Sequence, residues 1–182
     1  FLEGLNENRE AVSGVFSTQG TTTDSQISYK NESINTKPGT YDIEITQLAT
    51  KGAYQGGSVD LLDFVSPVEI NDSNDQFSMN LNGQTADITL TQGSFASGDE
   101  LAAEIQLQIN SAENFKKYGY STSVLFNATS NSFDITSSKF GADSQVYITS
   151  GDTNTANTLG FSGLGDGEFN GTPLTTLNSD YF

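Results

Sequence analysis

The sequence predicts a mainly β protein of the α+β class, in which antiparallel sheets form two small lobes and one amphipathic helix packs on a sheet. Two patterns carry this prediction. Apolar and polar residues alternate with period two in several short runs, and one run alone, residues 97–110, has convincing helical periodicity. Because strands are predicted on both sides of that helix, the central part of the chain is expected to form a ββαβββ module.

The first clear strands follow from alternation and turn chemistry. Apolar side chains alternate with polar ones over residues 41–46, directly after the turn signal Pro38-Gly39. A β-hairpin is predicted over residues 77–90, because two alternating runs meet there at Asn82-Gly83. Both residues tolerate the positive φ that a type I′ turn requires, so this pair is a strong hairpin signal.

The helix is predicted from its cap and its apolar stripe. Ser97 followed three residues later by Glu100 forms a capping box, and acidic residues near the start suit the positive end of the helix dipole. Leu101, Ile105 and Ile109 recur at four-residue spacing and should pack on the sheet. The helix is expected to end near Ala112.

The rest of the chain is read as strands joined by polar turns. Strands are predicted at residues 123–126, 132–136, 145–149 and 174–177, and weaker strand character at residues 27–29. Loops are predicted at residues 51–57 and 118–120, and a short turn at residues 156–161 that brings Leu159 and Phe161 onto the core. Three segments follow: residues 1–66 as the first β-rich part of a discontinuous base lobe, residues 67–162 as the ββαβββ module, and residues 163–182 as a Gly-rich return segment.

Charge and composition exclude several functions. The 182 residues include 23 acidic and 7 basic ones, which gives a formal net charge of −16. Such a field repels phosphate backbones and anionic membranes, so neither nucleic acid nor membrane is an expected partner. The chain has no Cys and no His, which excludes a thiol nucleophile, a Ser-His-Asp triad and the commonest metal ligand. No stretch approaches the ~20 apolar residues of a membrane span.

Candidate chemistry is sparse. The carboxylate pairs Asp42/Glu44, Asp99/Glu100 and Asp166/Glu168 are interpreted as a solvated face, a helix cap and a loop, and not as glycosidase acids. The oxygen-rich loops at residues 71–75 and 163–168 could in principle bind calcium, but neither has EF-hand spacing and turn formation explains both. The sequence therefore predicts no catalytic residue, no cofactor, no metal and no enzyme.

Loop aromatics are the remaining candidates for binding. Tyr54 lies among glycines, and Tyr118 and Tyr120 flank Gly119. Aromatic side chains in loops can anchor a partner. The alternative is that these rings cover sheet edges.

Two stretches then resemble a known family. Residues 39–49 read GTYDIEITQLA, which resembles the N-terminal signature of flagellar hook-associated protein 2, the bacterial filament cap family. Residues 75–161 are similar to the IN module of flagellins and hook-associated proteins. The shared features are a DxFxxxxNG hairpin at residues 75–83, the helix LAAEIQLQIN at 101–110, the strand FDITS at 133–137 and the closing ANTLGF at 156–161.

The resemblance implies a structural role. A cap protein is a homo-oligomer, secreted to the tip of the flagellar filament, that retains exported flagellin and promotes its folding and insertion. Flagellin, the hook–filament junction proteins and a host surface ligand are the partners it implies. The coiled-coil legs of that family have no counterpart here, so the chain is expected to be an internal, exposed fragment. The alternatives are a carbohydrate- or receptor-binding adhesin module and the outer domain of a flagellin.

Overall fold

The computed structural model describes residues 43–151, 153–161, 168–169, 171 and 175–178. The chain divides into two compact units, one made of Phe1–Ile43 with Asn178–Phe182 and the other of Glu44–Leu177. Nearly all described residues belong to the second unit. The predictions for residues 1–42, including the strand character at residues 27–29, lie outside the described residues.

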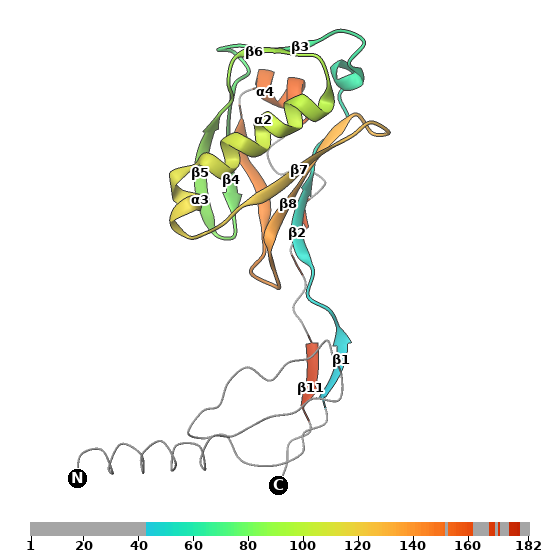
Figure 1. Cartoon of the computed structure of the whole chain (residues 1–182), viewed down its shortest axis with the longest axis vertical. Coiled ribbons are helices and arrows are strands. Elements are labelled where there is room, and N and C mark those ends of the chain that lie inside the picture. Colours follow the sequence, from blue (N-terminus) through green and yellow to red (C-terminus); the bar gives the residue numbers. More distant parts are fainter. Residues whose placement is uncertain (1–42, 152, 162–167, 170, 172–174, 179–182) are drawn as a thin grey trace, which may run out of the picture. The chain divides into compact units, whose positions relative to one another are not determined.

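The secondary structure is mostly strand (Figure 1). The strands are β1 (Ile43–Gln47), β2 (Lys51–Gln55), β3 (Val68–Ile70), β4 (Gln76–Leu81), β5 (Gln84–Thr89), β6 (Gly93–Phe95), β7 (Thr122–Asn127), β8 (Ser132–Phe140), β9 (Val146–Gly151), β10 (Glu168–Phe169) and β11 (Thr175–Asn178). The helices are the 3-10 helix η1 (Asp60–Asp63) and the α-helices α2 (Gly98–Ser111), α3 (Glu113–Lys117) and α4 (Thr153–Leu159).

The strands pair into four sheets. One has the order β10-β2-β8-β7, one the order β5-β4-β9, and two are the pairs β3-β6 and β1-β11. The pairings within the first three sheets are all antiparallel. This architecture confirms the predicted mainly β, α+β class.

The hairpin prediction is confirmed in detail. β4 pairs with β5 in register from Gln76↔Thr89 to Leu81↔Gln84. The two residues between the strands, Asn82 and Gly83, have φ of 53° and 86°. Positive φ at both positions is the requirement of a type I′ turn, whose twist matches that of the strands.

The helix α2 also follows the prediction. The Glu100 N–H donates to Ser97 Oγ at 3.2 Å, which makes Ser97 the N-cap, and Glu100 Oε2 accepts from the N–H of Ala96, the residue before the cap, at 3.0 Å. The apolar stripe is buried completely, at Leu101, Ile105 and Ile109. The sequence did not predict the short helix α3, which begins at Glu113, directly after the C-terminal end of α2.

Two loop predictions are wrong. Residues 51–55 form β2, which pairs with β8, although Gly52 and Ala53 made this run look like a loop. Residues 153–159 form α4 where a turn was expected from residue 156 onward. Thr and Asn are weak helix formers, so burial of Thr155 and Leu159 against the core, and not propensity, accounts for this helix. The prediction that Leu159 and Phe161 reach the core is confirmed.

The three predicted segments, residues 1–66, 67–162 and 163–182, pair with one another through their strands. β2 comes from the predicted segment 1–66 and pairs with β8 of the segment 67–162. β10 comes from the predicted return segment and pairs with β2. The predicted strand at residues 174–177 corresponds to β11. The division into three segments itself stays a prediction.

Phe161 lies at the centre of an aromatic cluster in the core. Its ring meets Phe77 at 5.0 Å, Tyr54 at 6.0 Å and Phe133 at 6.3 Å between centroids, each edge-on. Edge-to-face contacts suit the quadrupole of aromatic rings. Because the three partners belong to β4, β2 and β8, this one side chain joins the two larger sheets.

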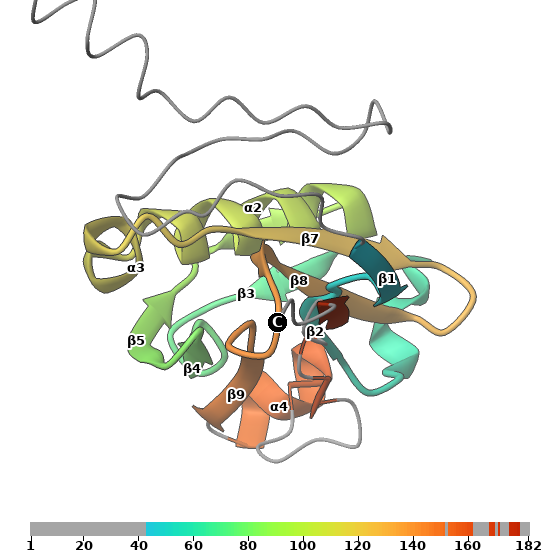
Figure 2. The ribbon, with the colours of Figure 1, turned by 90° about the horizontal axis from the view of Figure 1, so that it is seen from below.

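Polar side chains of α2 and α3 bond backbone groups on both flanks of the helix pair, and Figure 2 shows α2 running beside β7. On one flank, Asn110 exchanges hydrogen bonds with the backbone of Thr122 at 2.8 and 3.0 Å, and Gln106 Oε1 accepts from the Val124 N–H at 2.9 Å. On the other flank, Asn114 donates to the Thr85 carbonyl at 2.9 Å, and Glu104 accepts from the Thr91 N–H at 2.7 Å. These side chains satisfy backbone groups that would otherwise be unpaired at the outer side of β7 and next to β5.

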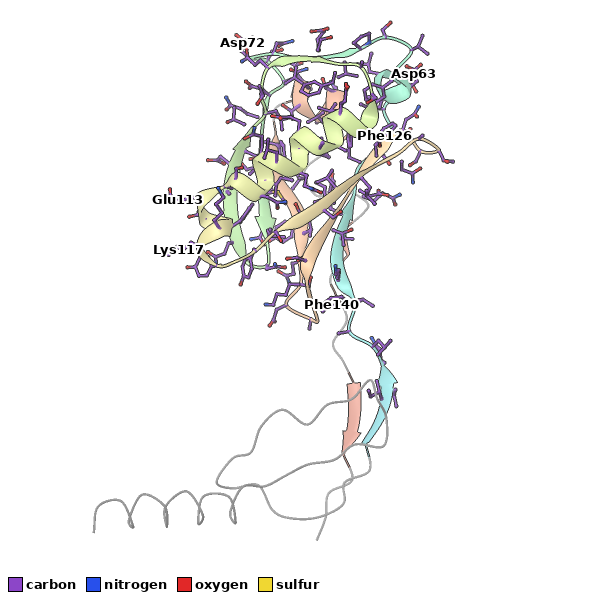
Figure 3. All side chains as sticks on the ribbon, viewed as in Figure 1. Asp63, Asp72, Glu113, Lys117, Phe126 and Phe140 are labelled. Carbon is purple, nitrogen blue, oxygen red and sulfur yellow. The ribbon has the colours of Figure 1, made fainter. Side chains whose placement is uncertain are left out.

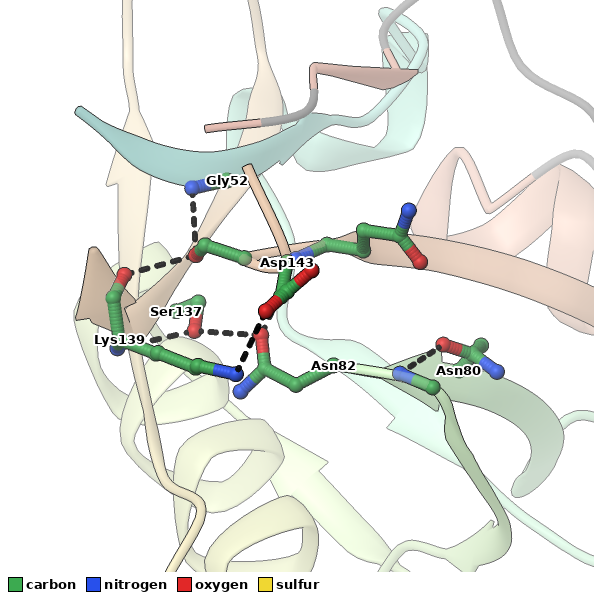
Figure 4. Close-up of polar contacts among 9 residues, drawn as sticks. Gly52, Asn80, Asn82, Ser137, Lys139 and Asp143 are labelled. Atoms are coloured by element: carbon green, nitrogen blue, oxygen red, sulfur yellow. Dashed lines mark hydrogen bonds and ion pairs between the residues drawn. The ribbon is translucent and has the colours of Figure 1, made fainter. Parts of the chain in front are cut away.

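A buried polar network also joins the sheet β10-β2-β8-β7 to the sheet β5-β4-β9 (Figure 4). Asn82 Oδ1 accepts from Ser137 Oγ at 3.1 Å and from the Gln145 N–H at 3.0 Å. Ser144 Oγ donates to the Lys139 carbonyl at 2.7 Å and accepts from the Gly52 N–H at 2.8 Å. The network therefore connects the β4–β5 turn with β8, β2 and the segment before β9. Within the described residues, Asn82 Nδ2 is the member of this network that is buried without a hydrogen-bond partner.

Candidate functional site

Tyr118 and Tyr120 lie together at the end of α3. Their rings stack with centroids 5.9 Å apart, and Tyr118 is 50% exposed while Tyr120 packs partly against the core. The ammonium of Lys117 lies 5.7 Å from the Tyr118 ring and that of Lys139 lies 5.8 Å from the Tyr120 ring. We call these four residues the tyrosine–lysine patch. The structure thus brings together two of the three aromatic residues that the sequence singled out.

The tyrosine–lysine patch is unusual in this acidic chain. Two of the four lysines in the described part belong to it, and Lys116 is adjacent in sequence. Lys139 also lies 3.9 Å from the carboxylate of Asp143, an exposed ion pair of small energetic value (Figure 4). The remaining lysine, Lys51, lies 4.9 Å from the exposed Phe140 ring. The sequence predicted the aromatic rings here but missed the lysines that lie over them.

Tyr54 is not a surface residue, so the prediction of an exposed loop aromatic is wrong at this position. It lies in β2 and is 1% exposed, with its ring against Phe161. The glycines around it suggested a loop, but Gly52 allows close backbone approach between β2 and the segment before β9 instead. Gly52 shows this directly, because a Cβ there would lie 2.3 Å from the Ser144 carbonyl oxygen.

A second surface feature is a hollow of about 470 Å³ between η1, β3 and α4, which we call the acidic hollow. Three acidic side chains line it, and all three are exposed: Asp60, Asp63 and Glu69. Two large apolar side chains, Leu61 and Val65, also line it and are 63% and 86% exposed. No sequence pattern predicted this feature, since these residues indicated only the end of the first β-rich segment.

Phe64 explains how Leu61 and Val65 stay in solvent. Its φ is 53°, a left-handed conformation that is strained for a bulky residue by about 1 kcal/mol or more. Its ring packs edge-on against Phe126 with centroids 5.2 Å apart, and Asp63 Oδ1 accepts from the Val65 N–H at 2.9 Å. The ring contact and the hydrogen bond tie down the backbone at Phe64 and Val65.

The carboxylate pairs have structural roles where they are described. Asp99 and Glu100 are exposed in the first turn of α2, where Glu100 completes the cap. Asp42 and Asp166 lie outside the described residues, so their pairs with Glu44 and Glu168 are not defined. The prediction that none of them is catalytic stays a prediction.

The oxygen-rich loop at residues 71–75 is tied by its own side chains. Asn71 Oδ1 accepts from the Ser73 N–H at 3.0 Å, and Asn74 Oδ1 accepts from the Asn71 N–H at 2.7 Å. The first is the bond of an Asx turn, and the second closes the loop from its other end, in keeping with turn formation. Asp75 is buried. Its Oδ2 accepts a hydrogen bond from Gln92 at 2.9 Å, and its Oδ1 has no partner among the described residues.

Within the described ranges, no three acidic side chains converge as a metal-binding group. The second loop, residues 163–168, is described only at Glu168.

Glu104 is the titratable group with a resolved perturbation in the described part. Partial burial opposes ionisation, but hydrogen bonds from the Thr91 N–H, the Thr91 hydroxyl and Gln108 outweigh it, so the pKa of the carboxyl lies below its usual value. The side chain fastens α2 to the segment after β5. The perturbation therefore reflects a structural contact.

The described residues define a mainly β, α+β fold that carries two exposed surface features, the tyrosine–lysine patch and the acidic hollow. Among the described residues, no helix combines the length and apolar character needed to cross a bilayer. No protein-family model matches the chain, and no curated protein matches it.

Two solved structures of flagellar cap proteins are similar to this chain. The D2–D3 domains of the flagellar cap protein FliD from Escherichia coli match with a TM-score of 0.47 and 18% identity, over 83% of this chain and 70% of that one. FliD from Bdellovibrio bacteriovorus matches with a TM-score of 0.36 and 19% identity, over 79% of this chain and 69% of that one. Both scores and both identities are low, so these likenesses carry no functional conclusion.

Proposed function

We propose that this chain is an exposed, non-catalytic part of a bacterial flagellar filament cap. In this role it belongs to a secreted homo-oligomer at the filament tip, which retains exported flagellin and promotes its folding and insertion. Contacts with flagellin, with the hook–filament junction proteins and with a host surface ligand belong to the same proposal. Its requirements are modest, namely polar lobes that contact neighbours weakly.

One observation carries the proposal. The residues behind the sequence resemblance meet in a single core, where the hairpin supplies Phe77, the helix α2 supplies Leu101, β8 supplies Phe133 and the closing motif supplies Phe161. The first signature, at residues 39–49, supports it further, because Ile43–Gln47 form the strand β1. The motifs that resemble cap proteins are therefore the ones that build the fold.

The proposal is tested by an in-frame deletion of the coding segment for residues 41–161 in the source bacterium. We expect unassembled flagellin in the medium and bare hooks by electron microscopy, both reversed when the intact gene is supplied. Normal filaments with normal flagellin retention would contradict an assembly role for this region.

A milder variant separates surface contact from folding. Tyr118→Ala shortens an exposed side chain of the tyrosine–lysine patch, and Leu125→Ala makes a comparable change on an exposed residue of β7. If the patch contacts cap neighbours, the first strain leaks more flagellin than the second, at equal secretion of the two proteins. Equal leakage from both strains would remove the patch from the proposal.

A second candidate function is an adhesin module that binds carbohydrate or a receptor. The stacked tyrosines favour it, because a half-exposed aromatic pair can serve as a platform for a ligand. Binding of the purified chain to a glycan array, lost in Tyr118→Ala and on chelation of calcium, would support this function.

A flagellin outer domain is the remaining alternative from the sequence. Deletion of residues 41–161 would then remove filament subunits and not the cap.

A further inference from the structure

We propose that the acidic hollow is a docking site for a segment of a partner protein in which lysine or arginine side chains stand beside bulky apolar ones. The inference is independent of the proposed function, because it rests on the charge, shape and exposure of the hollow alone. Its parts are the carboxylates of Asp60, Asp63 and Glu69 and the apolar side chains of Leu61 and Val65.

The charge of the hollow selects a cationic partner. None of the described residues that line it is basic, so a lysine or arginine entering it meets three carboxylates and no like charge. The lysines of the tyrosine–lysine patch lie elsewhere, and Figure 3 labels Asp63 and Lys117 at opposite ends of the folded unit. The net charge of −16 on the whole chain adds a long-range field that speeds the approach of a cationic segment.

The apolar rim selects a partner with bulky side chains as well as charge. A single exposed leucine needs no explanation, but Leu61 and Val65 flank one hollow and are among the most exposed apolar side chains of the described part. Between them, the Phe64 ring is anchored on Phe126 and the Val65 N–H is bonded to Asp63, so the backbone turn that carries the rim is formed without a partner. A preformed turn loses less conformational entropy on binding, which favours affinity.

The test uses the full chain and a short synthetic peptide that alternates lysine with leucine, labelled for fluorescence anisotropy. Asp60→Asn combined with Glu69→Gln removes two rim charges, and we expect peptide binding to weaken about tenfold. Leu61→Ser combined with Val65→Ser should weaken it by a similar, roughly tenfold, factor. Asp63 is left unchanged because it fixes the turn at Val65.

A matched control removes the same amount of charge elsewhere. Asp99→Asn combined with Glu113→Gln changes two exposed carboxylates outside the hollow, and we expect it to leave peptide affinity unchanged. Peptides that alternate glutamate with leucine, or lysine with serine, should bind much more weakly. Thermal unfolding confirms that each variant is folded.

Three outcomes would overturn the inference. The first is no binding of the lysine–leucine peptide to the unchanged chain. The second is equal weakening by the hollow variant and the matched control, since the attraction would then be general and not local. The third is self-association of the chain that the hollow variants abolish, because the occupant would then be a second copy of this protein.

Discussion

At the residue scale, Gly160 shows why the closing motif has the sequence it has. Its φ is 71°, and a Cβ at this position would lie 2.2 Å from the Gly57 carbonyl oxygen. The same approach lets the Gly57 N–H donate to the Gly160 carbonyl at 2.8 Å. Only glycine meets both conditions without strain, and the turn it makes directs Phe161 into the core.

Glu104 makes a prediction about pH at the same scale. Its pKa is lowered in the folded chain, so its contribution to stability is present above the ordinary pKa that the carboxyl has in the unfolded chain and is lost as the pH falls through the lower folded value. We expect Glu104→Gln to be less stable than the unchanged chain at neutral pH, and the gap to close in acid. Urea unfolding across this pH range measures it. A gap that stays constant with pH would refute the assignment.

At the element scale, the predictable parts of the chain are those whose pattern is local. The hairpin and α2 could be predicted because turn residues, caps and apolar spacing agree over a short range. β2 and α4 could not be predicted. Gly52 and Ala53 have low strand propensity, and the threonines of α4 have low helix propensity, so burial in the core stabilises both elements. Of the candidate surfaces, the tyrosines were visible in the sequence. The acidic hollow was not, because its members meet only through η1, β3 and α4.

The edge contacts of α2 give a prediction about this element. Asn110→Ala removes the hydrogen bonds to both backbone groups of Thr122, which is partly offset by the better helix propensity of alanine. We expect a net loss of about 1–2 kcal/mol in the free energy of unfolding. Ser111→Ala, at an exposed neighbouring position, should change it by less than about 0.5 kcal/mol. Chemical denaturation of both variants decides, and equal stabilities would show that the edge contact is energetically neutral.

At the scale of the whole molecule, two features hold the larger sheets together: the aromatic cluster around Phe161 and the polar network around Asn82. They lie on different parts of the same interface and use different physics. Burial of the rings supplies most of the stabilisation, while the network fixes how the β4–β5 turn meets β8. The sequence identified Asn82 as a turn residue and missed its second role.

That second role can be isolated experimentally. Asn82→Gly keeps a residue that tolerates positive φ and deletes the amide that bonds Ser137 and the Gln145 N–H. We expect a loss of about 1–2 kcal/mol, because Ser137 Oγ and the Gln145 N–H lose their acceptor. Removal of the buried Asn82 Nδ2, which has no hydrogen-bond partner among the described residues, offsets part of this loss. Asn131→Gly is the control, because Asn131 also has positive φ, at 47°. Scanning calorimetry compares the two, and equal losses would mean that the Asn82 amide contributes nothing beyond the turn.

The side-chain amides of Asn110 and Gln106, on the outer side of β7, affect how this strand can meet another molecule. A strand with free backbone groups invites a strand from another molecule, and such fusions are hard to reverse. At Thr122 and Val124 the helix already occupies the place where a foreign strand would add. A strand from another molecule therefore cannot pair with β7 at these two positions, and any contact there is made by side chains.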